Sequence, residues 1–284
     1  MLVSVCMITY NHASYIAQAI EGVLKQEGSF QIELIIGDDA SVDSTHSICE
    51  EYALKYPDIV RLLPACPNMG IMRNFVRTLR SCSGNYIAVC EGDDYWIDNE
   101  KLSKQVTFLE QNPDFNLCGH EVFLEKNGQL TNEKGGVYPK SVFTFEDIAS
   151  INLRIPTASL MYRNNIVFPE WINHLYGGDR ALIFLNAQKG KLKVMNFPWA
   201  VYRIHDGGAE QKYKYDKFLL PLRNIKEDSV YLSQVHSSKH RQQIRKRILH
   251  NHLYILYWSI RKVKIALMFK TFFQLLQFQF NFSK

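Results

Sequence analysis

Residues 2–24 read LVSVCMITYNHASYIAQAIEGVL, and this stretch decides the fold. Its first part, Leu2–Ile8, is a nearly unbroken apolar run that predicts a buried strand. Behind it, apolar residues recur at positions 16, 19, 20, 23 and 24, which is the spacing of an amphipathic helix. A buried strand followed by a helix begins a βαβ unit, so the stretch predicts a parallel sheet covered by helices.

The same alternation continues along the first half of the chain. Further strands are predicted at residues 32–36, 59–63 and 86–90, with helices through residues 48–56 and from residue 70 between them. In the second half the pattern predicts a helix ending before Pro113, a helix at 181–189, and strands at 117–124, 157–162, 194–195 and 201–204. Residues 126–139 are polar and rich in glycine, which predicts a surface loop. The fold class predicted is therefore α/β.

Composition narrows the class of protein. The chain has 284 residues, 46% hydrophobic and 21% charged, so it is large enough for one sizeable core and disorder is not expected. The net charge is +5, and basic residues gather toward the C-terminus, which favours an anionic surface over nucleic acid as a partner. With no basic leader and no apolar run of about 18 residues, we expect neither a signal peptide nor a spanning helix. None of the six cysteines forms a CxxC pair, which favours buried, reduced thiols in a cytosolic protein.

Polar residues follow each of the first four predicted strands. In an open parallel sheet, ligands bind beyond the carboxyl ends of the strands, so these residues are candidates for one common site. The candidates are Thr9, Tyr10 and Asn11 after the first strand, Asp38 and Asp39 after the second, Asn68 and Gly70 after the third, and Glu91, Asp93 and Asp94 after the fourth. The sequence contains neither a G-x-G-x-x-G turn nor a G-x-x-x-x-G-K-S/T loop, which disfavours a nicotinamide dehydrogenase and a P-loop nucleotidase.

Three carboxylates crowd the end of the fourth predicted strand. Glu91, Asp93 and Asp94 repel one another unless a cation lies between them. Mg²⁺ or Mn²⁺, held by one or two of these carboxylates and by diphosphate oxygens, would supply that cation. Asp93 is the first candidate for a metal ligand and Asp94 the second. The alternative is a simple acidic turn in front of Tyr95 and Trp96.

Three segments lie at the ends of the predicted strands: MITYN at 7–11, GDDASVDST at 37–45 and EGDDYW at 91–96. They resemble family 2 glycosyltransferases, in particular bacterial enzymes of surface polysaccharide synthesis, and the similarity continues through GD at 178–179 and YRIH at 202–205. The resemblance implies a GT-A fold, in which a Rossmann-like, mostly parallel sheet is flanked by helices. Residues 1–210 would form the catalytic domain, with a nucleotide-sugar-binding half at 1–110 and an acceptor half at 111–210. Residues 211–284 would be a basic, aromatic helical extension.

The resemblance implies that a nucleotide-sugar donor binds at the strand ends. Thr9, Tyr10 and Asn11 would line the pocket of the base, with Tyr10 available to contact the base itself. Alternatively, Asn11 only caps the following helix. Asn68 belongs to the same predicted donor site. Arg73 could orient a phosphate or the ribose through charged hydrogen bonds, or equally be a solvated helix residue.

Asp38 and Asp39 form a pair that the resemblance places at the base or the ribose. The second member of such a pair accepts the hydrogen bond, so Asp39 is the candidate and Asp38 its support. An acceptor there suits the uracil N–H and favours a UDP-sugar. Both carboxylates could instead stabilise the start of the next helix. Ser41, Asp43 and Ser44 are better placed as caps, which would leave the two aspartates free.

The resemblance also implies a metal-dependent, inverting transfer. Asp179 would take the proton from the acceptor hydroxyl in a single displacement, although an aspartate in front of a predicted helix could instead be its N-cap. His205 would approach the metal or the diphosphate, or else be a structural or simply exposed histidine. The implied metal ligands are Asp93, Asp94 and His205. Glu91 stands where the family usually has the first Asp of an Asp-x-Asp motif, and it is assigned to the donor site.

The C-terminal extension combines basic with aromatic residues, which predicts a helix lying on an anionic membrane surface. A packed terminal helix or a dimer contact is the alternative. A glycan or lipid-linked acceptor would then be met at the cytoplasmic face of the membrane, in surface polysaccharide assembly, and no nucleic acid is expected. Two other functions stay open. One is a catalytically inactive nucleotide-sugar-binding module of the same fold; the other is a nucleotidyltransferase, which would need a basic, glycine-rich phosphate loop that the sequence lacks.

Overall fold

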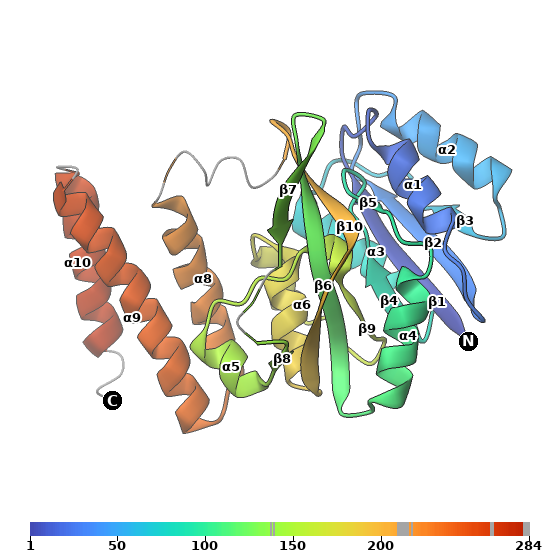
Figure 1. The fold of residues 1–284 in the computed structure, drawn as a ribbon. Helices are drawn as coiled ribbons and strands as arrows, with labels where there is room; N and C mark the ends of the chain where they lie inside the picture. Colours follow the sequence, from blue (N-terminus) through green and yellow to red (C-terminus); the bar gives the residue numbers. More distant parts are fainter. Residues whose placement is uncertain (137, 139, 209–215, 217, 262–263, 281–284) are drawn as a thin grey trace. The chain divides into compact units, whose positions relative to one another are not determined.

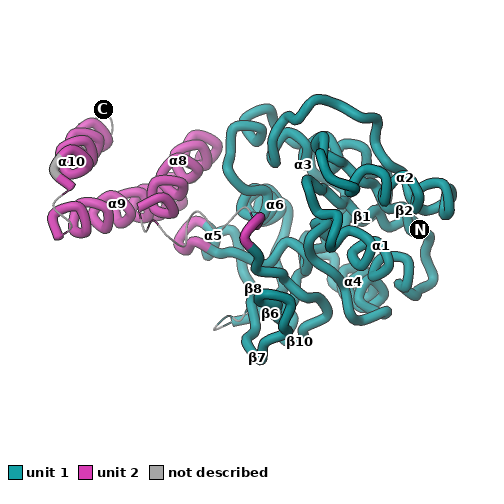
Figure 2. The backbone as a smooth tube through the Cα atoms, turned by 90° about the horizontal axis from the view of Figure 1, so that it is seen from above, with its two compact units in different colours: residues 1–148, 153–205 teal, residues 149–152, 206–284 magenta. Residues whose placement is uncertain are grey.

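The computed structural model describes the chain except for residues 137, 139, 209–215, 217, 262–263 and 281–284 (Figure 1). The described residues divide into two compact units, residues 1–148 with 153–205 and residues 149–152 with 206–284 (Figure 2). They are called unit 1 and unit 2 below. Every residue predicted to take part in catalysis, donor binding or metal binding lies in unit 1.

Unit 1 contains the parallel sheet that the strand–helix alternation predicts. Four parallel strands lie in the order β3-β2-β1-β4: β1 (Leu2–Thr9), β2 (Gln31–Asp38), β3 (Val60–Leu62) and β4 (Tyr86–Val89). The helices between them are α1 (Ile16–Leu24), α2 (Thr45–Lys55) and α3 (Ile71–Arg80). Right-handed crossovers put α1 and α2 on one face of the sheet and α3 on the other (Figure 1).

The second half of unit 1 extends this sheet with strands of mixed direction. The full order is β3-β2-β1-β4-β9-β6-β10-β5, in which β10 is parallel to β6 while β9 and β5 are antiparallel to their neighbours. The added strands are β5 (Tyr95–Trp96), β6 (Phe115–Lys126), β9 (Met161–Arg163) and β10 (Lys191–Ile204), with β7 (Gln129–Gly135) paired to β6 and β8 (Val142–Phe143) paired to β10. The helices are α4 (Lys101–Gln111), α5 (Phe145–Ser150), whose last two residues belong to unit 2, α6 (Gly178–Ala187) and two short 3₁₀ helices, Thr157–Ser159 and Glu170–His174. The prediction of an α/β fold with a mostly parallel sheet flanked by helices is confirmed.

The prediction of a surface loop at residues 126–139 is wrong. Residues 129–135 form β7, which pairs with the end of β6 as a hairpin. The turn is Asn127-Gly128, and its φ angles of 51° and 73° lie in the left-handed region that a two-residue hairpin turn requires. Positions 137 and 139 of the predicted loop lie outside the described residues.

Other boundaries in this half also differ from prediction. The strand predicted at 157–162 begins as a 3₁₀ helix and is reduced to β9. The strands predicted at 194–195 and 201–204 are one strand, β10, whose register with β6 shifts between Met195 and Ala200. The helix predicted at 181–189 is α6, which starts and ends earlier. The errors in the strands fall where long-range pairing, rather than local pattern, sets the boundary.

The hydrophobic core explains why the first strand is so apolar. Val3, Val5 and Met7 of β1 have no exposed surface, and they share one cluster with Ile16 and Ile20 of α1. Each fully buried aliphatic side chain of this kind contributes roughly 1.5–3 kcal/mol. The strand is therefore held firmly up to its last residue, which fixes the starting point of the polar segment that follows.

Unit 2 is helical, as predicted for the C-terminal extension. It contains α8 (Leu219–Gln234), α9 (Ser238–Arg261) and α10 (Ile265–Phe280). Arg247 of α9 forms an ion pair of 2.6 Å with the buried Asp228 of α8. Among the helices that the structure describes, none combines the length and the apolar character needed to cross a membrane.

Candidate functional site

The carboxyl ends of three parallel strands meet at one edge of the sheet. β1 ends at Thr9, which pairs in register with Asp38 at the end of β2. The backbone N–H of Asp39 donates to the carbonyl of Thr9 at 3.0 Å, and the N–H of Gly92 donates to the carbonyl of Ile8 at 2.9 Å. Polar segments that follow three separate strands in the sequence are therefore neighbours in space.

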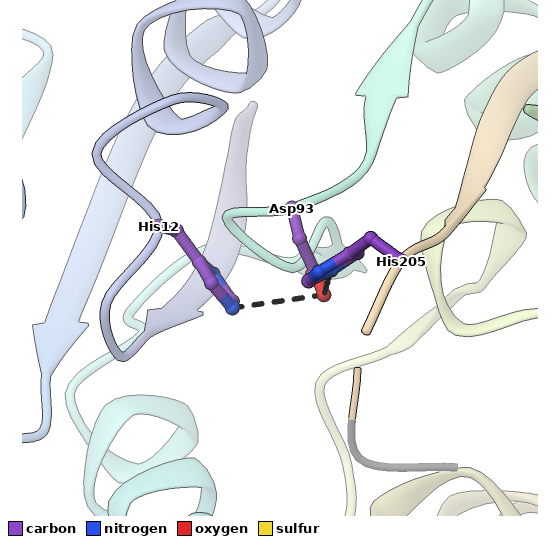
Figure 3. A group of neighbouring side chains, drawn as sticks. All are labelled: His12, Asp93 and His205. Carbon is purple, nitrogen blue, oxygen red and sulfur yellow. Dashed lines mark hydrogen bonds and ion pairs between the residues drawn. The ribbon is translucent and has the colours of Figure 1, made fainter. Parts of the chain in front are cut away.

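Asp93 contacts two histidines at this edge (Figure 3). Its Oδ2 atom lies 3.2 Å from Nε2 of His205 and 3.6 Å from Nε2 of His12. The three residues come from the segments after β4, β10 and β1 respectively. Their side chains are only 15–16% exposed. The sheet edge thus holds a mostly buried cluster of two imidazoles and one carboxylate.

His12 is missing from the residues that the sequence predicts. Its backbone N–H donates to Oγ1 of Thr45 at 2.8 Å, and its carbonyl accepts the N–H groups of Tyr15 and Ile16 at 2.8 and 2.9 Å. Its position is therefore fixed by the start of α1 on one side and by α2 on the other. A histidine just beyond a strand that ends at a ligand edge is a signal in the sequence, but only the fold shows that it faces Asp93.

Burial and mutual repulsion set the ionisation of the carboxyl groups. Burial alone would raise the pKa of Asp93, but the hydrogen bond with His205 and the nearby imidazole of His12 outweigh it and lower that pKa. Asp94 is fully buried, and burial together with the charges of Asp93 and Glu91 raises its pKa well above the ordinary value. Burial also lowers the pKa of His12. A cation would stabilise the ionised form of both aspartates.

The donor atoms at this edge fit a divalent cation. Two groups, each with its ligand atoms within 4.8 Å of one another, share Asp93: one adds His12 and His205, the other Glu91 and Asp94. Within the described part of the chain, the buried atoms Oδ1 of Asp93 and Oδ2 of Asp94 have no hydrogen-bond partner. Buried carboxylate oxygens usually have one, so these atoms are suited to a metal ion. The predicted ligands Asp93, Asp94 and His205 thus meet around Asp93.

Arg203, in the YRIH motif, holds the acidic segment in place and is also missing from the predicted site residues. Its guanidinium lies 5.0 Å from the centroid of the Tyr15 ring and 4.3 Å from that of Tyr95. The same group donates to the carbonyl of Asp93 at 2.9 Å, and the backbone N–H of Arg203 donates to Oδ1 of Asp94 at 2.9 Å. Arg203 is therefore a positioning residue for both aspartates.

Asp38 and Asp39 are not free, contrary to the prediction. The two carboxylate oxygens of Asp39 accept the backbone N–H groups of Met69 and Gly70 at 2.8 and 2.9 Å. Oδ2 of Asp38 lies 3.0 Å from Nδ1 of His46. Asp39 therefore draws the loop before α3 to the end of β2. Each of its oxygens keeps a second lone pair, which leaves room for a further hydrogen bond from a ligand.

The residues expected to cap α2 differ from one another. Asp43 accepts the backbone N–H of Thr45 at 2.9 Å. Ser44 occupies the N-cap position but makes no side-chain capping bond. Ser41 donates its hydroxyl to Asp38 at 2.5 Å instead, so this serine orients the carboxylate that capping was expected to leave free.

The segment after β1 is anchored to the loop before α2. Asn11 has a φ of 56°; its N–H donates to Oγ of Ser41 at 2.9 Å, and its side-chain oxygen accepts the N–H of Val42 at 2.9 Å. These bonds run away from α1, so the alternative in which Asn11 merely caps that helix is wrong. Thr9 is buried, whereas Tyr10 is 44% exposed and open to a ligand.

Helix α3 brings Arg77 rather than Arg73 to the strand ends. The side chain of Arg73 is exposed. Arg77, one turn later, donates from Nη2 to the carbonyl of Asp38 at 3.2 Å. Asn68 donates from Nδ2 to the carbonyl of Asp39 at 2.8 Å. Asn68 and Arg77 therefore both fix the backbone of the aspartate pair, and a donor-binding role of Arg73 stays a prediction.

Asp179 lies in the first turn of α6. The helix starts at Gly178 with Gly177 as its N-cap, so the alternative in which Asp179 is the N-cap is wrong. The Asp179 carboxylate is 16% exposed and lies 3.8 Å from Nη1 of Arg154. At Gly178 an added Cβ would lie 2.1 Å from the ring of Phe75. Glycine therefore permits the start of α6 to pack directly on a side chain of α3.

Comparison with known protein sequences shows a family and several relatives. The sequence profile described as "Glycosyl transferase family 2" matches residues 4–166. The chain is 34% identical over 206 residues to "Uncharacterized protein Rv1520" of Mycobacterium tuberculosis, which covers 72% of this chain and 59% of that protein. It is 28% identical over 216 residues to "Uncharacterized glycosyltransferase alr2836" of Nostoc, covering 72% and 65%. The chain therefore spans less than two thirds of the length of these relatives.

Solved structures share the fold at low sequence identity. The S. aureus TarS fragment 1–349 in complex with UDP-GlcNAc matches with a TM-score of 0.72 and 18% identity, covering 98% of this chain and 81% of that one. The mannosyltransferase PcManGT from Pyrobaculum calidifontis, in complex with GDP-Man and Mn²⁺, matches with a TM-score of 0.60 and 13% identity, covering 97% and 84%. At such identities the likeness bears on the fold alone, and it agrees with the GT-A architecture expected from the sequence.

Proposed function

Since the chain belongs to glycosyl transferase family 2, we propose that it moves a sugar from a nucleoside diphosphate sugar to a hydroxyl group of an acceptor. One observation carries the proposal: His205, Asp93, Asp94 and Glu91 gather at the carboxyl edge of the sheet, where α/β folds bind their ligands. The relative alr2836, itself named a glycosyltransferase, supports the same activity.

Asp93, Asp94 and His205 would hold the metal ion, Mg²⁺ or Mn²⁺. The ion would offset the charge of the departing nucleoside diphosphate. The unpartnered oxygens of Asp93 and Asp94 support this role, and PcManGT, named with Mn²⁺, has the same fold. Glu91 completes the acidic group and would contact the donor. Arg203 keeps the backbone of the acidic segment fixed while the donor enters and leaves.

The donor would lie along the ends of β1, β2 and β4. Tyr10 is exposed there for contact with the base, and Thr9 and Asn11 would line the pocket of the base. Asp39 would accept a further hydrogen bond from the base or ribose, which favours a UDP-sugar, and Asp38 and Asn68 would support it. The complex of TarS with UDP-GlcNAc supports that choice through the shared fold. Arg73 would contact a phosphate.

Asp179 would act as the general base. Its carboxylate takes the proton from the acceptor hydroxyl, whose oxygen bonds to the anomeric carbon while the bond from that carbon to the diphosphate oxygen breaks. A single displacement of this kind inverts the configuration at the anomeric carbon. Arg154, 3.8 Å away, would orient the carboxylate toward the acceptor.

We place this reaction in surface polysaccharide synthesis at the cytoplasmic face of a membrane, with a glycan or a lipid-linked acceptor and no nucleic acid. Unit 2 supports the location, because no acidic residue follows Asp228 and exposed aromatic side chains lie on α9 and α10. Such a surface suits peripheral binding to anionic lipid.

The test is a calorimetric titration of the full chain with UDP, GDP, CDP and dTDP, each with and without Mn²⁺. We expect one nucleotide, UDP, to bind in a metal-dependent manner and Asp93→Ala to abolish that binding. Asp58→Ala, at an exposed aspartate, is the matched control and should bind as the wild type does. The corresponding nucleotide sugar is then assayed for transfer. A folded protein that binds none of the nucleotides would refute the proposed function, and binding without turnover would identify an inactive binding module.

A further inference from the structure

The imidazole of His12 has no conventional hydrogen bond among the described residues. Its buried Nδ1 atom has no partner there, and its Nε2 atom is 3.6 Å from the nearest carboxylate oxygen, on Asp93. That distance exceeds the usual length of a hydrogen bond. A buried ring nitrogen without a hydrogen-bond partner is costly unless something else binds it. His205, at 3.2 Å from the same oxygen, differs, because its distance allows a hydrogen bond.

The spacing of the three ligand atoms suits a metal ion between them. Two atoms bound to one ion at about 2.1 Å lie about 3.0 Å apart when the angle at the ion is a right angle and about 3.4 Å apart when it is tetrahedral. The distances from Oδ2 of Asp93, 3.2 Å to Nε2 of His205 and 3.6 Å to Nε2 of His12, are close to these two expected separations. Oδ1 of Asp93 remains available as well, since it has no partner within the described structure.

Both imidazoles are held in position before any ion arrives. The loop of His12 is fixed by Thr45, and the next residue, Ala13, donates its N–H to Asp43 at 3.1 Å. The ring of His205 lies against Tyr15, with centroids 4.8 Å apart. Preorganised ligands lose little freedom when they bind, so the arrangement favours tight binding.

We propose that His12 is a metal ligand together with Asp93 and His205, and that this pair of imidazoles makes the site select a first-row transition-metal ion over Mg²⁺. Imidazole nitrogen is a borderline-soft ligand that suits transition metals, whereas Mg²⁺ prefers oxygen ligands and gives up its water reluctantly. The biological meaning of this metal preference rests on the proposed function. Metal binding itself can be measured without a nucleotide.

The first measurement is pulsed electron paramagnetic resonance on the full chain, stripped with a chelator and loaded with Mn²⁺ alone. Couplings from nitrogen nuclei report coordinated imidazole directly. We expect two imidazoles in the wild type, one in His12→Ala, and two in the control His174→Ala, which alters an exposed histidine. In calorimetry, His12→Ala should weaken Mn²⁺ binding by at least about tenfold and leave the weaker Mg²⁺ binding nearly unchanged.

The outcomes separate this inference from the proposed function. A wild-type spectrum with one imidazole or none, or equal affinities for Mn²⁺ and Mg²⁺, would overturn the inference even if UDP binds. Two imidazoles with no nucleotide binding would uphold it while the proposed function fails. If circular dichroism shows that His12→Ala is misfolded, His12→Gln replaces it, and the wild-type spectrum alone still decides the number of imidazoles.

Discussion

Asp179 differs from the other acidic residues of the candidate site in its surroundings. It comes from α6 and faces Arg154, whereas Asp93 is surrounded by His12 and His205. Loss of a base should therefore affect the reaction rate and not the binding of the donor. We expect Asp179→Asn to lower kcat by about 10²–10⁴-fold, with an unchanged Kd for the nucleotide sugar. Steady-state release of the nucleoside diphosphate and calorimetry measure the two quantities.

The matched control for this variant is Glu170→Gln, because Glu170 is an exposed acid that pairs with Arg80 at 3.0 Å. The control should keep the wild-type kcat. A full rate in Asp179→Asn, or weaker donor binding without any loss of rate, would remove Asp179 from the role of base.

The buried Lys101 makes the stability of the fold depend on pH, independently of the candidate site. It is fully buried on α4, with its ammonium 4.0 Å from the centroid of the Trp96 ring and donating to Gln105 at 2.7 Å. Burial lowers the pKa of Lys101 to about 7. The unfolded lysine has a pKa of about 10.4, so between these values the unfolded chain binds more protons and this group makes stability rise with pH.

We therefore expect the stability of the wild type to rise with pH relative to Lys101→Met, by up to about 1.4 kcal/mol per pH unit in that window. Urea unfolding at a series of pH values from about 7 to 10 measures it. The exposed Lys25 provides the control Lys25→Met, which should follow the wild type. Parallel pH profiles for wild type and Lys101→Met would show that Lys101 keeps its charge in the folded protein.

The local sequence pattern predicts a residue of this site only where that residue lies at the end of an apolar strand. Thr9 ends β1, Asp39 directly follows β2 and Asp93 lies in the short segment after β4, so the strand ends point to them. His12 and Arg203 act through contacts with Asp93 that join separate segments of the chain. Such contacts exist only in the folded sheet, and for that reason the sequence pattern does not contain them.

At the level of elements, the β6–β7 hairpin carries two sequence signals that disagree. The dipeptide Asn127-Gly128 is a strong local signal for a two-residue hairpin turn. The residues of β7 are nevertheless mostly polar and exposed, because this strand lies off the main path of the sheet and pairs only with β6. The polar composition of this segment predicts a loop, whereas the Asn127-Gly128 turn predicts the hairpin that the structure shows.

The start of α6 depends on Gly178 and its contact with Phe75 of α3. We expect Gly178→Ala to destabilise the fold by about 1–3 kcal/mol, because the ring is buried and the added methyl group forces it or the helix to move. The shift would displace Asp179 and lower kcat, while Mn²⁺ binding at Asp93 stays the same. Urea unfolding, transfer kinetics and calorimetry measure these effects.

A double-mutant cycle with Phe75→Leu is the control for this contact. The smaller side chain makes room for the added methyl group, so the double variant should be less destabilised than the sum of the two single changes. Additive effects would mean that the strain at Gly178 arises elsewhere.

For the molecule as a whole, the two halves of unit 1 differ in what the sequence can predict. In β3-β2-β1-β4, helix α1 connects β1 to its neighbour β2 and helix α2 connects β2 to its neighbour β3, as the alternation and the right-handed crossover predict. The chain then returns through α3, and β4 pairs with β1 on the other side. In β4-β9-β6-β10-β5 the neighbours come from distant parts of the chain and pair in both directions. That order depends on long-range pairing, which a local pattern does not encode.

Unit 2 presents features that suit an anionic membrane surface. Exposed apolar side chains recur at helical spacing on its two C-terminal helices: Leu253, Tyr254, Tyr257 and Ile260 on α9, and Phe269, Phe272 and Phe273 on α10. Exposed cations accompany them at Arg261, Lys264 and Lys270. Monomeric surfaces rarely leave such rows uncovered, and the positive charge favours lipid over a second copy of the same positively charged surface.

We therefore expect the full chain to sediment with vesicles of phosphatidylcholine and phosphatidylglycerol, and much less with phosphatidylcholine alone. Lys264→Gln/Lys270→Gln should weaken binding by about 1 kcal/mol for each lost charge, and added salt should do the same because it screens the attraction. Lys25→Gln/Lys189→Gln in unit 1 makes the same change in net charge and should leave binding unaltered. Equal binding to both kinds of vesicle would refute the electrostatic contribution of the basic residues to membrane binding. If neither kind binds, the exposed aromatic rows must instead be covered by protein, and the packed-helix or dimer alternative replaces the membrane.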